Sequence, residues 1–225
     1  MMNKNSFIAL GLVLLLALSA CAQNSQEAKD TTVKSEKFST EQEDFLLKTD
    51  ELNNYLDSPA GWRTDAMEVV GDQFVNIDPY ACRYKVSDVK QTDQMQIAFN
   101  ASQFGPVLIQ QLRLVGNENA MGLIADVHEA LKNCEQGEPL VDRKHETTSY
   151  TFSLEDSSEI PNSVMWKRTT NSTDPNAEYV TNVAHGALMV KGDVLVCFIW
   201  GITPATADLA DPKILLEAMK IVAQK

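Results

Sequence analysis

The sequence predicts a single α+β domain in which helices pack mainly on one face of an antiparallel sheet. Several segments alternate apolar and polar residues, which is typical of strands, and short turns join successive segments. Between them lie segments whose apolar residues recur every three to four positions, as in a helix. Strands connected by short turns favour antiparallel pairing. The roughly 180 residues from 45 to 225 suit one domain with one core.

The domain is predicted to begin with a helix and three strands. Thr49 is a plausible N-cap for the helix, which ends at the turn-forming residues 58–61. Three strand candidates follow, at residues 74–77, 81–84 and 107–115. In the third candidate, Leu108, Leu112 and Leu114 share one face, which predicts that this face is buried.

The clearest helix of the sequence follows Asn117 and Asn119. Its apolar stripe has helical spacing and consists of Ala120, Leu123, Ile124, Val127 and Leu131. Gly137 ends the helix. Two further strands are predicted at residues 148–154 and 163–170, because apolar and polar side chains alternate there.

The C-terminal part is predicted to form a β-hairpin and a last helix. Residues 178–190 and 194–200 flank a compact turn at Gly192, where a positive φ angle would be needed. Asp211 and Pro212 provide an N-cap and a first helical residue. The helix would turn an apolar face inward that consists of Ile214, Leu215, Ala218, Met219 and Val222.

The N-terminal residues resemble a bacterial lipoprotein signal. An apolar run of 12 residues, 7–18, follows Lys4, and the small residues Ser19 and Ala20 stand directly before Cys21. This lipobox-like pattern predicts that residues 1–20 are a signal peptide and that Cys21 is the lipid attachment site for acyl chains such as palmitate. The run is shorter than the roughly 20 apolar residues that span a bilayer. The alternative is an ordinary secretory signal in which Cys21 is incidental.

Residues 21–44 are predicted to form a flexible tether, because they are mostly polar and can bury little surface. The chain has a formal net charge of −12, which becomes −13 without residues 1–20, where Lys4 is the only charged residue. Such a polyanion without a basic cluster excludes nucleic acid as a partner. We therefore expect a protein held by lipid at the extracytoplasmic face of the cell membrane.

Three cysteines remain after Cys21, and exported proteins lie where disulfides persist. Three pairings are possible in principle, and one cysteine must be left over. Cys134 continues the apolar stripe of its helix, and Cys82 lies in a short strand that could run beneath the end of that helix. These positions favour a disulfide between Cys82 and Cys134. Cys197 would then be a buried, inert thiol within an apolar strand.

No catalytic, cofactor-binding or metal-binding pattern stands out in the sequence. A Gly-x-Ser-x-Gly elbow, a glycine-rich phosphate loop and a helical pair of histidines are all absent. His128, His145 and His185 are interpreted as surface histidines or as core histidines with satisfied hydrogen bonds. Five carboxylates could be imagined in acid–base pairs or a calcium site: Asp72, Asp78, Glu155, Asp156 and Glu159. Their spacing matches no calcium loop, which favours solvated loops.

The three tryptophans allow two interpretations. Trp62, Trp166 and Trp200 could line a ligand groove, since aromatic side chains supply large rigid contact areas. Core packing is favoured, because Trp166 lies in an alternating strand and Trp200 ends a strongly apolar one.

The domain also has a recognisable layout. It consists of an opening segment at 45–52, Cys82-Arg83-Tyr84 in an early strand, a helix at 120–134 that ends in cysteine, and a final hairpin and helix. This layout resembles the family of the extracellular sensor domain of the mycobacterial kinase PknH, which also occurs as stand-alone actinobacterial lipoproteins. The resemblance implies an α+β domain with a broad cleft, the Cys82–Cys134 disulfide and a ligand-sensing role without catalysis. Family members usually have a second disulfide, for which Cys197 lacks an obvious partner, and often a tryptophan in place of Leu131.

The sequence thus predicts a lipid-anchored, noncatalytic envelope protein that binds a small ligand or a partner protein. Two alternatives stay open. An envelope hydrolase with a dispersed active site would be marked by a pocket that contains a titratable pair. A carrier of lipids or other hydrophobic molecules would require a deep apolar cavity.

We expect nonreducing peptide mapping by mass spectrometry, on protein purified from membranes, to find acylated Cys21 and a peptide that links Cys82 to Cys134. Acylation follows from the lipobox-like pattern, and the link follows from the positions of the two cysteines. An unmodified N-terminus, or Cys197 in the bridge, would contradict these two assignments.

Overall fold

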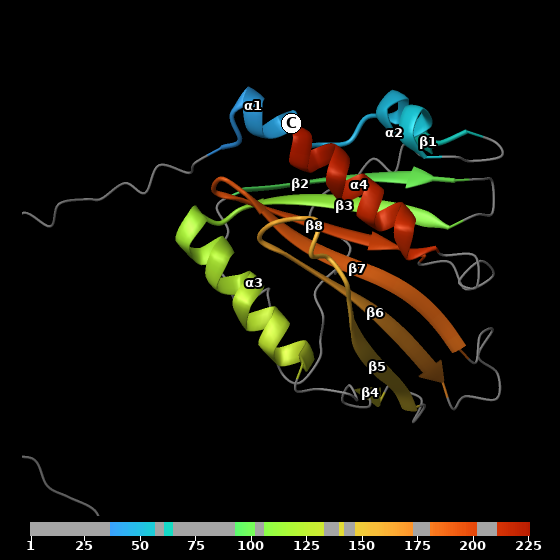
Figure 1. Cartoon of the computed structure of the whole chain (residues 1–225). Helices are drawn as coiled ribbons and strands as arrows, with labels where there is room; N and C mark the ends of the chain where they lie inside the picture. The colour runs from blue at the N-terminus through green and yellow to red at the C-terminus, as the bar shows by residue number, and fades with distance from the viewer. Residues whose placement is uncertain are drawn as a thin grey trace, which may run out of the picture. The chain divides into compact units, whose positions relative to one another are not determined.

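A single antiparallel sheet organises the computed structural model (Figure 1). The structure describes residues 37–56, 61–64, 93–101, 106–132, 140–141, 147–172, 181–201 and 211–225. Within these ranges, eight strands neighbour one another in this order: β1 (Arg63–Thr64), β2 (Asp93–Asn100), β3 (Val107–Leu114), β8 (Val194–Trp200), β7 (Thr181–Lys191), β6 (Ser163–Ser172), β5 (Thr147–Glu155) and β4 (Leu140–Val141). Each neighbouring pair is antiparallel, which confirms the predicted fold class.

Helices cover both faces of this sheet (Figure 1). On one face, α4 (Pro212–Gln224) packs together with the segment that contains α1 (Thr40–Glu43) and α2 (Thr49–Tyr55). On the opposite face lies α3 (Asn117–Lys132). Most of the described helices therefore share one face, as predicted, while the longest one forms a second core on the other.

Strand β8 lies between the two cores, and all seven of its residues are buried. Val194, Val196, Phe198 and Trp200 face α4, whereas Leu195, Cys197 and Ile199 face α3. The sequence of such a strand is a continuous run of apolar residues, because neither face of the strand is exposed to water. Burial of each large apolar side chain here contributes about 1.5–3 kcal/mol to stability.

The predicted helices form at the positions that their apolar spacing and capping residues indicate. The buried residues of α3 are the predicted stripe, and the side chain of Asn119 donates to the carbonyl of Val115 at 2.8 Å. Helix α4 begins at Pro212, and the carboxylate of Asp211 accepts from the backbone N–H of Lys213 at 2.9 Å. Helix α2 differs by one residue: its N-cap is Lys48, whose backbone N–H donates to Glu51, and Thr49 is already helical.

Strands β3, β5, β6, β7 and β8 confirm the strands predicted downstream of residue 106, and Gly192 has the expected positive φ of 61° in the β7–β8 turn. Strand β2 was not predicted, because glutamine and aspartate interrupt its apolar residues. Helix α1 lies within the predicted tether, where Ser39 and Gln42 form a capping box, so the ordered chain starts before Phe45. The strand candidates at 74–77 and 81–84 lie outside the described residues.

A few polar contacts hold the N-terminal segment against the sheet and α4. The buried side chain of Gln110 accepts from the backbone N–H of Leu47 at 2.7 Å and donates to the carbonyl of Phe45 at 2.8 Å. The Lys225 ammonium donates to the Leu46 carbonyl at 2.7 Å and to Glu51 at 2.8 Å. These contacts join residues that are more than 60 positions apart in the sequence.

We expect Gly186→Ala to destabilise the domain by about 1–3 kcal/mol, because a Cβ at this position would overlap ring atoms of the buried Trp166 side chain. Chemical denaturation measures this change in the free energy of unfolding. Gly122→Ala is the matched control: it lies on the exposed side of α3 with no atom near the added carbon, and alanine should stabilise the helix by about 0.5–1 kcal/mol. Equal effects of both substitutions would contradict the packing of Trp166 on Gly186.

Candidate functional site

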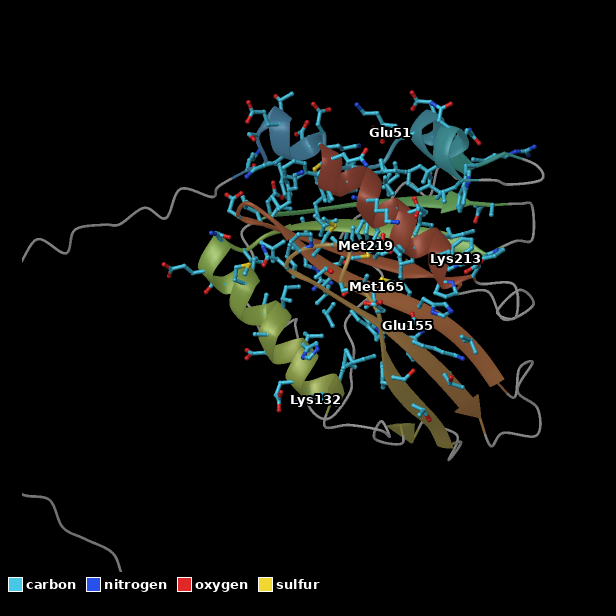
Figure 2. The ribbon with its side chains drawn as sticks, in the orientation of Figure 1. Glu51, Lys132, Glu155, Met165, Lys213 and Met219 are labelled. Atoms are coloured by element: carbon cyan, nitrogen blue, oxygen red, sulfur yellow. The ribbon has the colours of Figure 1, made fainter. Side chains whose placement is uncertain are left out.

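A pocket of about 310 Å³ lies where β5 ends beside the first turn of α4. Its lining residues are Glu155, Asp156, Met165, Pro212, Lys213 and Leu216. Figure 2 shows Glu155, Met165 and Lys213 in one region between the sheet and the start of α4. The volume is at the lower end of the range for small-molecule sites.

Regular secondary structure fixes the walls of the pocket. Glu155 is the last residue of β5 and pairs in register with Met165 of β6. Met165 is buried and belongs to the core beneath α4. Pro212, Lys213 and Leu216 come from the first turns of α4. The pocket therefore has an apolar wall and a charged rim, both built on a strand end and a helix start.

The carboxylate of Glu155 contacts the imidazole of His185. The His185 Nδ1 atom lies 2.8 Å from Oε2 and 3.0 Å from Oε1 of Glu155. The side chain of His185 is 5% exposed, and that of Glu155 is 19% exposed. An ionised carboxylate only accepts hydrogen bonds, so an ionised Glu155 pairs with the tautomer of His185 that carries a proton on Nδ1. His185 is thus the more buried partner, while Glu155 is one of the residues that line the pocket.

Asp156 adds a second carboxylate directly after Glu155. Its Oδ1 atom accepts from the backbone N–H of Ser158 at 2.9 Å. This backbone hydrogen bond and a further one from the Ser158 side chain lower the pKa of Asp156. Asp156 is therefore ionised at neutral pH, and among the described residues the rim also holds the acidic Glu155 and the basic Lys213.

The loop after Asp156 packs against α4 and forms an ion pair with it. Ile160 is buried in the core beneath α4, and the Lys220 ammonium contacts Glu159 at 2.8 Å and Glu217 at 2.7 Å. The hydrogen bonds that the ammonium donates to these two carboxylates raise the pKa of Lys220. The loop thus keeps Asp156 close to the start of α4.

The structure places the predicted histidines and carboxylates as follows. His128 is exposed on α3 and His185 is a paired core histidine, which confirms their interpretation. Asp156 and Glu159 are exposed loop residues, as expected, but Glu155 is not a solvated loop residue. Its contact with His185 spans 30 positions, and no motif marks it. The signal in the sequence is a histidine within an apolar strand, since a buried imidazole needs a partner.

The tryptophans and cysteines have clear positions where they are described. Trp62, Trp166 and Trp200 are all buried in the cores, which confirms the packing interpretation. Cys197 is fully buried and forms no disulfide within the described part of the chain. The remaining residues named from the sequence lie outside the described ranges: Cys21, Cys82, Cys134, Asp72, Asp78 and His145. Their lipid attachment, disulfide and solvated-loop assignments stay predictions.

Metal-binding clusters and membrane-spanning helices are both absent from the described residues. They contain no group of three or more histidine, cysteine, aspartate or glutamate side chains placed to hold a metal ion. None of the helices within the described ranges is long and apolar enough to cross a membrane.

Comparison with known proteins gives similarity to solved structures but no sequence relative. No protein-family model matches the chain, and no curated protein matches it. A solved structure of the extracellular domain of PknH from Mycobacterium tuberculosis is similar, with 15% sequence identity and a TM-score of 0.48. The match covers 85% of this chain and 100% of that one. This similarity assigns neither a family nor a site to the chain.

We expect Glu155→Ala to lower the free energy of unfolding by about 1–3 kcal/mol, because it leaves the buried His185 imidazole without its acceptor. Urea denaturation measures the change. Glu159→Ala removes an equal charge from the exposed pair with Lys220 and should cost less than about 1 kcal/mol. Similar losses in the two variants would show that the Glu155–His185 pair contributes no more than a surface ion pair.

Proposed function

We propose that the chain is a lipid-anchored, noncatalytic binding module of the cell envelope that holds a small ligand in the pocket between β5 and α4. The observation that carries the proposal is the fixed carboxylate of Glu155, which lines a pocket with a buried apolar wall. Ligand sites of this kind combine an apolar surface with a few well-placed polar groups. The lipobox-like residues before Cys21 support anchoring at the extracytoplasmic face of the membrane.

The orientation of the Glu155–His185 pair favours binding over catalysis. In a catalytic dyad, a buried carboxylate orients an imidazole that faces the substrate. Here the order is reversed, because the imidazole is buried and the carboxylate lines the pocket. A carboxylate fixed in this way is preorganised, so little side-chain entropy is lost when a ligand binds.

The two alternative functions fit the pocket less well. A carrier of hydrophobic molecules requires a deep apolar cavity, but Glu155, Asp156 and Lys213 place charges in this pocket. An envelope hydrolase is favoured by one observation, a titratable Glu155–His185 pair beside a pocket. Ester hydrolysis that is lost in Glu155→Gln would therefore support the hydrolase and contradict the binding module.

We expect small-molecule fragments to shift the methyl signal of Met165 in NMR spectra of the full chain labelled with ¹³C at its methionine methyl groups. Met165 lines the pocket, whereas Met121 is 39% exposed on α3 and serves as the internal control. Leu216→Trp should fill the pocket and abolish the shifts. Leu154→Trp is the matched control, because Leu154 is exposed and does not line the pocket. A library in which no fragment shifts Met165 selectively would overturn the proposed binding function.

A further inference from the structure

We infer that the pocket selects small ligands that carry a positively charged amino group on an apolar body, an inference that rests on the proposed binding function. Among the described residues, the lining contains the acidic residues Glu155 and Asp156 and the basic residue Lys213. The chain as a whole has a formal net charge of −12, which attracts cations to the surface. Both the local and the global charge therefore favour a cationic ligand.

Glu155 keeps the capacity to accept hydrogen bonds from such a ligand. Its two oxygens lie within hydrogen-bond distance of one atom, Nδ1 of His185. A carboxylate offers about four acceptor positions. An ammonium group has three donors, so it can bond to Glu155 while the imidazole stays in place. His185 acts here as a positioning residue, because it fixes the carboxylate and does not line the pocket.

Asp156 can complete the recognition of the amino group. Its hydrogen bonds with Ser158 fix the loop conformation and keep the carboxylate ionised. Asp156 follows Glu155 directly and is one of the described residues that line the same pocket. Charge-assisted hydrogen bonds of this type are about twice as strong as neutral ones.

The start of α4 is poorly suited to bind an anion, although helix N-termini often do so. Pro212 has no backbone N–H to donate. The N–H of Lys213 donates to the carboxylate of Asp211, and the N–H of Ile214 donates to the Asp211 carbonyl at 3.1 Å. The first three helical residues thus offer no unused donor to a phosphate or carboxylate.

The apolar residues of the pocket determine which uncharged part of a ligand fits beside the amino group. Met165, Pro212 and Leu216 provide an apolar surface beside the two carboxylates. The thioether of Met165 is polarisable and makes favourable contacts with aromatic rings. A pocket of about 310 Å³ suits a compact molecule, such as an amine with one ring, rather than a long chain.

The test compares three probes of similar shape on the full chain labelled at its methionine methyl groups: 2-phenylethylammonium, 2-phenylethanol and 3-phenylpropanoate. We expect the ammonium compound to shift Met165 and to bind at least about tenfold more tightly than the neutral alcohol, since one charge-assisted contact is worth about a factor of ten. The anionic probe should produce no shift. Met121 should stay unchanged with all three probes.

Variants assign the selectivity to the two carboxylates. Asp156→Asn and Glu155→Gln should each weaken binding of the ammonium probe about tenfold and leave binding of the alcohol unchanged. Asp156 is an exposed loop residue, so its variant stays informative if Glu155→Gln disturbs the fold. Glu159→Gln is the control: it changes the charge equally in the same loop, but Glu159 pairs with Lys220 and does not line the pocket.

The outcomes separate this inference from the proposed function. Selective binding of the ammonium probe that depends on Asp156 and Glu155 supports the inference. Equal shifts of Met165 by the alcohol or the anion would overturn selection for cations but leave a binding pocket in place. Met165 signals that respond to none of the probes and to no fragment would overturn both.

Discussion

The structure depends on one constraint, which is that both faces of β8 must be kept from water. Its seven residues are apolar on either side, so a sheet with one solvated face would expose three or four apolar side chains of this strand. Covering one face requires α4 and the segment around α2, and covering the other requires α3. The pocket forms at the start of α4, where this cover begins, and it lies over the outer strands β5 and β6.

Buried polar side chains serve to position segments within this apolar framework. Gln110 and His185 are both buried, and each meets a partner from a distant part of the chain. Leaving such groups without partners costs more than the hydrogen bonds gain, so they select one arrangement among several of similar apolar burial. Gln110 places the N-terminal segment, and His185 places the carboxylate of the candidate site.

Local patterns in the sequence predict much of this fold, but they do not predict the contacts between residues that are distant in the sequence. The stripe of α3, the Asp211–Pro212 start of α4 and the Gly192 turn depend on neighbouring residues, and they form as predicted. Strand β2 shows no clear apolar alternation, because polar residues interrupt it and only Ala98 and Phe99 of the strand are buried. The candidate site brings together β5, β6 and α4, and periodicity does not determine how these elements meet.

The distribution of tryptophan gives each core its own optical reporter. Trp62 and Trp200 lie in the core beneath α4, with ring centroids 5.6 Å apart, and Trp166 lies in the core beneath α3. Since the chain has three tryptophans, its indole fluorescence comes from these positions. In variants that keep a single tryptophan, the fluorescence would therefore report the unfolding of one core at a time. Coincident transitions would mean that β8 couples the two layers into one cooperative unit.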